Sequence, residues 1–254
     1  MKKSIQIIAT AFAILLGNVG FSQNDTMYVN YGGNVTIAIP TSQIDSLTFY
    51  RPNITTPSIT DADGNVYTSV TIGTQEWMTE NLRTTKYSDG TSIPNVTDDA
   101  EWGNLSTGAW SHYDNDSQYE ATYGKLYNWY AASNSRNVCP TGWHVPTDSE
   151  WTVLEDYLGA NEHNGVEGKA LKATSGWEDD GNGTDDYGWL GLPGGYRGSY
   201  GGFGDIGSSG GWWSSSQSST TNAWCRDLFN SSDNVYRSGG PNKLYGFSVR
   251  CLRD

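Results

Sequence analysis

Hydrophobic and polar residues alternate along this chain in short runs, most of them too short for long helices. Residues 66–72 alternate, Gly73-Thr74 follows as a turn signal, and residues 75–78 form a returning run. This pattern predicts a β-hairpin. Three further strand-like runs stand near the end of the chain, at 211–216, 223–229 and 245–253.

Helical periodicity is clear in one segment, Thr147 to Leu158. Thr147 can cap this helix, Glu150 can bond back to it three residues on, and Gly159 is expected to end it in the left-handed conformation. Its apolar stripe consists of Trp151, Leu154, Tyr157 and Leu158. Weaker patterns predict two shorter helices, at 123–133 and 166–174.

The beginning of the chain has the three parts of a secretory signal peptide. Lys2 and Lys3 precede an apolar run over residues 5–16, and small residues follow at Gly20 and Ser22. A helix of about twelve residues spans only about 18 Å, against roughly 30 Å for the hydrocarbon core, so this run is too short for a transmembrane anchor. We expect cleavage after Ser22 and a protein that is secreted or held at the cell surface.

Three parts follow the predicted signal peptide of residues 1–22. Residues 23–52 are a short leader rich in β-forming residues, which predicts a hairpin and a third strand. Residues 53–60 place two prolines among polar residues and indicate a linker. Residues 61–254 form the main domain. Within it, a Gly-, Asp- and Ser-rich region at 175–211 carries enough aromatic residues to predict an ordered loop region.

Composition and charge narrow the picture. The chain has 31 Gly, 11 Trp and 16 Tyr with only 17% charged residues, so aromatic side chains among short strands are expected to supply much of the core. The net charge is -13, and it becomes -15 when the signal peptide, with its two lysines and no acidic residue, is removed. An acidic chain repels nucleic acid and anionic lipid, so neither is expected as a partner.

The chain has three cysteines, Cys139, Cys225 and Cys251. Export to an oxidising compartment favours one disulfide, and three pairings are possible. In the run 245–253, Cys251 shares a face with Phe247 and Val249, which places its sulfur on the expected core side.

Four separated motifs resemble the Fibrobacter succinogenes major paralogous domain, in order and over about residues 61–254. They are GNVY at 64–67 with IGTQEWMTENL at 72–82, CPTGWHVPT at 139–147, LPGGYR at 192–197 and GFSVRC at 246–251. The resemblance implies a disulfide between Cys139 and Cys251 with Cys225 free. Closing a loop of about 110 residues contributes roughly 4 to 5 kcal/mol at most. The family brings no defined chemistry with it.

A fainter resemblance concerns the fold. The helix start at 145–151 and the strand at 246–251 are similar to those of the formylglycine-generating, sulfatase-modifying group, whose members are variants of the C-type-lectin fold. This implies an α+β, C-type-lectin-like domain with short antiparallel strands, two or three helices and long Gly-rich ordered loops. Copper-dependent formylglycine formation needs a pair of thiolates. The late region offers only Cys225, because Cys251 belongs to the terminal structural motif.

Other enzyme signatures are absent from the sequence, among them His-Glu-x-x-His, Cys-x-x-Cys and the P-loop motif Gly-x-x-x-x-Gly-Lys-Ser/Thr. His112, His144 and His163 lack metal-ligand spacing, and His144 is expected to be a packed, hydrogen-bonded core histidine. Asp148 and Glu150 lie in the first turn of a predicted helix, where capping explains them better than acid–base catalysis. We therefore expect a protein that is not an enzyme.

One acidic segment, residues 178–186, has the composition of a calcium loop. Calcium takes six to eight oxygen ligands on a flexible loop, although no EF-hand glutamate stands at the required position here. The candidate ligands are Asp179, Asp180, Asp185 and Asp186. A weaker candidate is 61–65. The alternative for both segments is a solvated turn without a metal ion.

The aromatic residues of the loop region favour ligand binding. Tryptophan and tyrosine on exposed loops offer flat faces to sugar rings, although small loop-rich domains also bury tryptophans as core. The predicted rim consists of Trp177, Trp189, Tyr196, Tyr200 and Trp212. Because adjacent strand residues face opposite sides, one of Trp212 and Trp213 is expected outside.

These features predict an extracellular recognition or adhesion module whose ligand is a glycan or a surface protein. The lectin calcium motif Glu-Pro-Asn is missing, which speaks against the usual calcium-bridged sugar binding. A structural surface module is the first alternative. An enzyme related to the formylglycine-generating group, without its cysteine pair, is the second.

Overall fold

The computed structural model describes residues 3–8, 26–31, 34–40, 44–50 and 59–254. Its internal contacts divide the chain into two units, Met1–Pro57 and Ser58–Asp254. Within the described ranges no helix has the length and apolar character needed to cross a membrane.

The first unit contains two pairs of strands. β2 (Thr26–Tyr31) and β3 (Asn34–Pro40) pair antiparallel, as the pattern of the leader predicts. β1 (Lys3–Ile8) pairs parallel with β4 (Ile44–Tyr50). The rest of the predicted signal peptide, and the predicted linker up to residue 58, lie outside the described residues.

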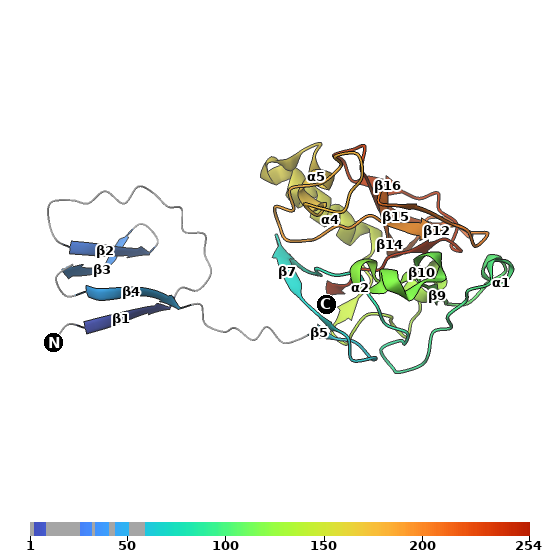
Figure 1. Cartoon of the computed structure of the whole chain (residues 1–254), viewed down its shortest axis with the longest axis horizontal. Coiled ribbons are helices and arrows are strands. Elements are labelled where there is room, and N and C mark those ends of the chain that lie inside the picture. The colour runs from blue at the N-terminus through green and yellow to red at the C-terminus, as the bar shows by residue number, and fades with distance from the viewer. Residues whose placement is uncertain (1–2, 9–25, 32–33, 41–43, 51–58) are drawn as a thin grey trace. The chain divides into compact units, whose positions relative to one another are not determined.

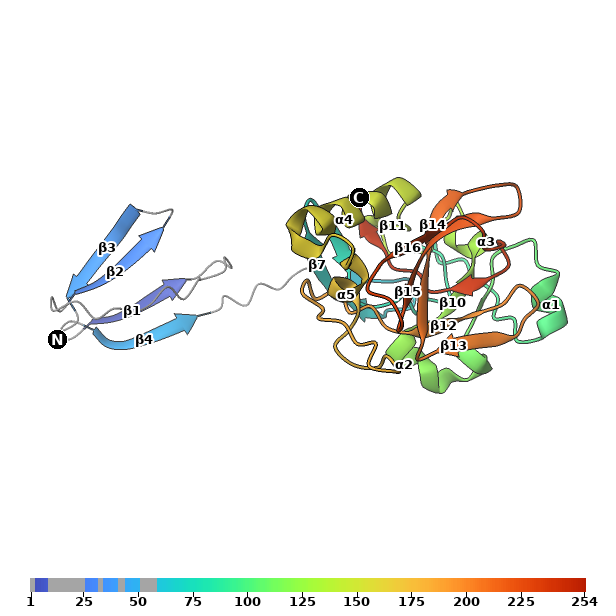
Figure 2. The same ribbon diagram turned by 90° about the horizontal axis from the view of Figure 1, so that it is seen from above.

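The second unit is built on a long sheet and a smaller one (Figures 1 and 2). In the long sheet the order is β16-β15-β14-β12-β17-β10-β9, with β13 paired to β12. Its strands are β9 (Trp110–Ser111), β10 (Leu126–Asn128), β12 (Gly194–Arg197), β13 (Phe203–Ile206), β14 (Ser209–Gln217), β15 (Ala223–Phe229), β16 (Tyr236–Ser238) and β17 (Gly246–Phe247). All its pairs are antiparallel except β12 with β14.

The smaller sheet has the order β11-β18-β8-β7. Its strands are β7 (Ser69–Ile72), β8 (Gln75–Met78), β11 (Trp143–His144) and β18 (Leu252–Arg253), and a separate pair is formed by β5 (Ile59–Thr60) and β6 (Val66–Tyr67). The hairpin β7–β8 is the one that the alternation around Gly73-Thr74 predicts. The domain is therefore mixed α+β, with mostly antiparallel sheets and few helices.

The helices are short. They are α1 (Asp99–Gly103), α2 (Glu120–Tyr123), α3 (Trp129–Ala132), α4 (Asp148–Leu158) and α5 (Glu167–Leu171). Figures 1 and 2 show α4 and α5 side by side at one end of the domain, away from α1. The third predicted helix, 166–174, is thus present but shorter.

Helix α4 begins as the sequence predicts. The Thr147 hydroxyl accepts a hydrogen bond from the Glu150 N–H at 3.2 Å, and the Glu150 carboxylate accepts one from the Thr147 N–H at 2.7 Å. The predicted end is wrong, because Gly159 keeps the helical φ of -60° and the chain continues into a wider turn over Gly159–His163. The left-handed residue is Glu162, with φ +72°.

Substitution of Thr147 by alanine removes this cap and leaves the Glu150 N–H without its acceptor. We expect Thr147→Ala to lower the free energy of unfolding by about 1 kcal/mol. Ser149→Ala, on the exposed side of the same turn, is the matched control and should change it by less than about 0.5 kcal/mol. Urea unfolding of both variants checks the expectation, and equal values would contradict it.

The predicted helix over 123–133 is wrong. Gly124 ends α2 because its φ of +76° is not helical. Only glycine fits here, since a Cβ at this position would lie 2.8 Å from the backbone oxygen of Leu82. The following residues form β10 between β9 and β17, and the Asn128 side chain then caps α3 by accepting the Ala131 N–H. The apolar residues of this short strand and of the two helical turns beside it have the spacing of a single helix, which explains the error.

Two other elements differ from the sequence pattern. The last predicted strand, 245–253, divides into β17 and β18, which belong to different sheets. The predicted loop region 175–211 contains the hairpin β12–β13. The strands at 211–216 and 223–229 are present as β14 and β15.

The long sheet is covered on both faces, and tryptophans supply much of the cover. Trp213 belongs to the cluster around the disulfide, with Tyr127 and Phe247, whereas Trp212 belongs to the cluster under α4. Both indoles are buried, so the prediction that one of them lies outside is wrong. Nine tryptophans are buried in all: Trp77, Trp102, Trp110, Trp143, Trp151, Trp177, Trp189, Trp212 and Trp213.

The disulfide joins Cys139 and Cys251, with a Cα–Cα distance of 6.0 Å, as the family resemblance implies. It ties the segment before β11 to the residue before β18. Cys225 is free and buried.

Candidate functional site

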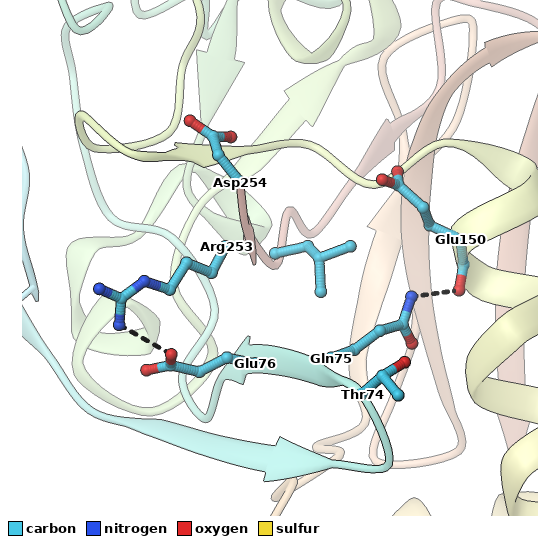
Figure 3. Close-up of a pocket in the computed structure, with 7 residues that line it drawn as sticks. Thr74, Gln75, Glu76, Glu150, Arg253 and Asp254 are labelled. Atoms are coloured by element: carbon cyan, nitrogen blue, oxygen red, sulfur yellow. Dashed lines mark hydrogen bonds and ion pairs between the residues drawn. The ribbon is translucent and has the colours of Figure 1, made fainter.

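A pocket opens where the smaller sheet meets the first turn of α4 (Figure 3). Its cavity has a volume of about 330 Å³. The lining comes from the β7–β8 turn, from α4 and from β18 with the residue after it: Thr74, Gln75, Glu76, Glu150, Leu252, Arg253 and Asp254. Segments about 175 residues apart in sequence thus meet at one site.

Several of its side chains are oriented by hydrogen bonds. The Gln75 amide donates to the backbone oxygen of Glu150 at 2.9 Å, and its oxygen accepts from the Trp77 indole at 3.3 Å. The Arg253 guanidinium donates to the Glu76 carboxylate at 2.8 Å, with side chains 52% and 29% exposed. The buried Trp77 therefore anchors the amide, while the ion pair stays accessible to a ligand.

His144 connects two acids at the edge of this pocket. Its Nδ1 lies 2.7 Å from the Asp254 carboxylate and its Nε2 lies 3.0 Å from the Glu150 carboxylate. With both carboxylates ionised, both bonds form at once only when the ring carries two protons. The expected hydrogen-bonded histidine is present, but with a side chain 31% exposed it is not a core residue.

Glu150 is held in its ionised form. Burial alone would raise its pKa, but hydrogen bonds from the Thr147 N–H and hydroxyl, together with His144, hold the pKa below its usual value. A carboxylate so engaged is a poor general acid, which agrees with a capping role. The pocket thus offers carboxylate, amide and guanidinium groups, and the side chain of Leu252 at its floor is buried.

A second cavity, of about 340 Å³, lies beside α2 and is lined by Arg83, Ser117, Glu120 and Ala121. Glu120 forms an ion pair with Lys125 at 2.8 Å. This cavity has fewer directed polar groups and serves below as a control surface.

A family model described as the Fibrobacter succinogenes major domain matches residues 70–253, most of the chain. The chain belongs to this family. In this chain the Fibrobacter succinogenes major domain includes all the pocket residues from Thr74 to Arg253, and Asp254 follows directly. Comparisons with curated proteins and with solved structures gave no match.

The aromatic rim predicted for this Fibrobacter succinogenes major domain is wrong in three of its five members. Trp177, Trp189 and Trp212 are 5%, 0% and 1% exposed and belong to the core cluster under α4. A glycine-rich segment has few aliphatic side chains, so its tryptophans turn inward to form a core. Tyr196 is half-buried against Tyr245, and Tyr200 is 90% exposed.

Three of the four aspartates of the predicted calcium loop have separate partners. Asp179 accepts from the Asn230 amide at 3.1 Å, Asp185 from the Leu190 N–H at 2.8 Å, and Asp186 from the Thr184 hydroxyl at 2.8 Å. Across the described residues, no three His, Cys, Asp or Glu side chains are grouped so that they could hold a metal ion. Calcium binding here stays a prediction of the sequence. It is tested by thermal unfolding with millimolar calcium, with the variant Asp185→Ala/Asp186→Ala as the control.

Sequence reasoning missed the pocket itself. Glu76 stands inside the motif at 72–82 and Arg253 two residues after the motif at 246–251, but their chemistry lies in their proximity, which only the fold creates. The usable signal is a charged residue directly beside a buried apolar one, as with Glu76 beside Trp77 and Arg253 beside Leu252.

Proposed function

We propose that this protein is a secreted, non-catalytic recognition module that binds a glycan in the pocket between the smaller sheet and α4. The observation that carries the proposal is the set of directed planar polar groups around Leu252. Sugar hydroxyls donate to carboxylates and accept from amide and guanidinium N–H groups.

Two further observations support an extracellular, non-catalytic role. The signal-peptide pattern at residues 1–22 and the Cys139–Cys251 disulfide both fit an oxidising compartment. The acids of the first turn of α4 are engaged in structure, because Asp148 pairs with Arg226 and Arg237 while Glu150 caps the helix. A C-type-lectin-like fold for the domain belongs to the same proposal.

A glycan array with the purified chain tests this function. We expect a defined subset of glycans to be retained, and Glu76→Gln combined with Arg253→Gln to weaken their binding at least tenfold. The double variant should keep its melting temperature, because an exposed ion pair adds little stability. Arg83→Gln at the second cavity is the matched control and should bind as the unchanged protein does.

The result also separates the alternatives. Retention of no glycan, or equal binding by the pocket variant, would overturn glycan recognition at this pocket. The remaining hypotheses would then be a surface protein as the ligand or a purely structural role.

A further inference from the structure

The carboxylate of Asp227, on β15, has few polar contacts to offset its loss of hydration. Its one hydrogen-bond donor among the described residues is the Cys225 thiol, at 3.3 Å, and a thiol is a weak donor. The side chain is half-buried, so part of it still faces solvent. Because a desolvated charge without a partner is unfavourable, this arrangement requires an explanation.

The cations of the neighbouring strands are engaged elsewhere. Arg226 pairs with Glu155 and with Asp148 at 2.8 Å, and Arg237 of β16 pairs with Asp148 at 2.7 Å and stacks on Trp224. These contacts lie on the other face of β15, because Arg226 alternates with Asp227 along the strand.

On the strands farther from Asp227, the charged groups are equally occupied. Arg197 of β12 is buried and bonds to Asp99 at 2.9 Å. Lys243, just before β17, donates to Gln217 at 3.0 Å and to the backbone oxygen of Thr220. No residue of β14 is charged, and Asp205 of β13 is itself an acid.

Aromatic rings flank the carboxylate. Gly211 of β14 lies opposite Asp227, and a Cβ on it would lie 3.0 Å from the Asp227 Oδ1 and 2.7 Å from the Phe247 Cδ1. Because Gly211 has no side chain, the Asp227 carboxylate and the Phe247 ring can both lie close to it. Phe247 stacks on Tyr245 with ring centroids 5.7 Å apart.

The aromatic cluster reaches the surface on both sides of Asp227. Tyr196 contacts Tyr245, with centroids 5.8 Å apart, and both rings are half-buried. On the other side Tyr236 of β16 lies opposite Asp227, is 44% exposed, and packs against Phe229 at 5.3 Å. Ring faces and a carboxylate with no cation are the two components that bind an alkylated ammonium group in water.

We propose that Asp227 forms a binding site for an alkylated ammonium group with the rings of Tyr236, Tyr245 and Tyr196, the last two of which pack against the buried Phe247. The carboxylate supplies the counter-charge, and the rings contact the polarised methyl groups around the nitrogen. This site is on a different sheet from the glycan pocket and does not depend on it. The source of the ammonium group is a small molecule such as choline or a methylated lysine side chain.

The direction in which the pKa of Asp227 shifts agrees with this geometry. Burial raises the pKa of Asp227 to about 6, against the smaller opposing effects of the Cys225 hydrogen bond and the Arg226 charge. The folded protein therefore holds this proton more tightly than the unfolded chain, so the contribution of Asp227 to stability is lost as pH rises from about 4 to about 6. At neutral pH the carboxylate is ionised and available to a cation.

Titration of the full chain with choline, with trimethyllysine and with lysine, followed by calorimetry or NMR, tests the proposal. We expect the two trimethylammonium probes to bind at pH 7.5, at least tenfold tighter than lysine and at least fivefold tighter than at pH 5. Preference for trimethyllysine over choline would identify a protein side chain as the source, and the reverse order a small molecule. Failure of all three probes to bind at 10 mM would overturn the site.

Asp227→Asn and Asp205→Asn are the paired variants. Asp227→Asn should abolish trimethylammonium binding yet melt higher than the unchanged protein at pH 7.5, with no difference at pH 4, because only a buried charge is removed. Asp205→Asn, near Tyr196 but outside the site, should bind normally. Unchanged binding by Asp227→Asn would contradict the proposal, whatever the glycan array shows, and Glu76→Gln with Arg253→Gln should bind choline as before.

Discussion

Loss of the Cys139–Cys251 disulfide is expected to lower the free energy of unfolding by at most about 4 to 5 kcal/mol. The two cysteines are 112 residues apart, so the bond removes a large part of the entropy of the unfolded chain. Both sulfurs lie in the larger core cluster, so replacement by alanine avoids burying a hydroxyl. Urea unfolding of Cys139→Ala/Cys251→Ala measures the loss.

The third cysteine provides the control for this experiment. Cys225→Ala removes one buried sulfur atom without opening a loop, and we expect it to cost about 1 kcal/mol. A reducing agent should lower the melting temperature of the unchanged protein and of Cys225→Ala, but not that of the double variant. A melting temperature that reduction leaves unchanged in all three proteins would contradict the structural role of the bond.

Arg250→Ala is expected to lower the free energy of unfolding by about 4 kcal/mol. The guanidinium is 0% exposed and lies 3.9 Å above the Trp189 ring centroid. It donates to the Asn81 Oδ1 at 2.8 Å and to the backbone oxygens of Trp189 and Leu190. Alanine leaves a cavity, removes a donor from the backbone oxygens of Trp189 and Leu190, and abolishes the cation–π contact, while Asn81 Oδ1 keeps the Trp212 indole as a donor. Burial lowers the pKa of Arg250 to about 9, so it is charged at neutral pH.

Two other variants make this prediction decisive. Arg136→Ala removes the same atoms from a side chain that is 54% exposed and 3.8 Å from Asp89, and should cost less than about 0.5 kcal/mol. If Arg250→Ala does not fold, Arg250→Lys gives a measurable protein, since lysine keeps the charge but not the planar donor geometry. Urea unfolding should place its loss at about 2 kcal/mol, and a loss no larger than that of Arg136→Ala would contradict the assignment.

Buried arginines are the feature that sequence reasoning passed over most completely. Arg197, Arg226 and Arg250 are 0% to 1% exposed, although arginine is usually a surface residue. Arg197 donates to the backbone oxygens of Gly201, Val96 and Thr97, and Arg250 to those noted above. Loops packed into a core leave carbonyl groups without ladder partners, and a buried guanidinium supplies the donors. Which loops are packed is a property of the whole fold.

Local features were predictable where the interaction joins residues close in sequence. The capping box of Thr147 and Glu150 spans three residues, and the β7–β8 hairpin turns at Gly73-Thr74. The segment 123–133 failed because its helical spacing is also that of two short turns around a strand. Only pairing with β9 and β17 selects between these conformations.

By itself, the sequence determined the family, the α+β class, the start of α4, the strands near the end of the chain and, through the family motifs, the disulfide. These depend on local propensity or on motifs that survive as linear patterns. The tertiary structure alone decided that Trp212 and Trp213 are both buried, that Trp177 and Trp189 are core residues rather than a rim, and that a polar pocket lies beside Leu252. Burial and proximity depend on what covers each face of a sheet, and residues far apart in sequence provide that cover.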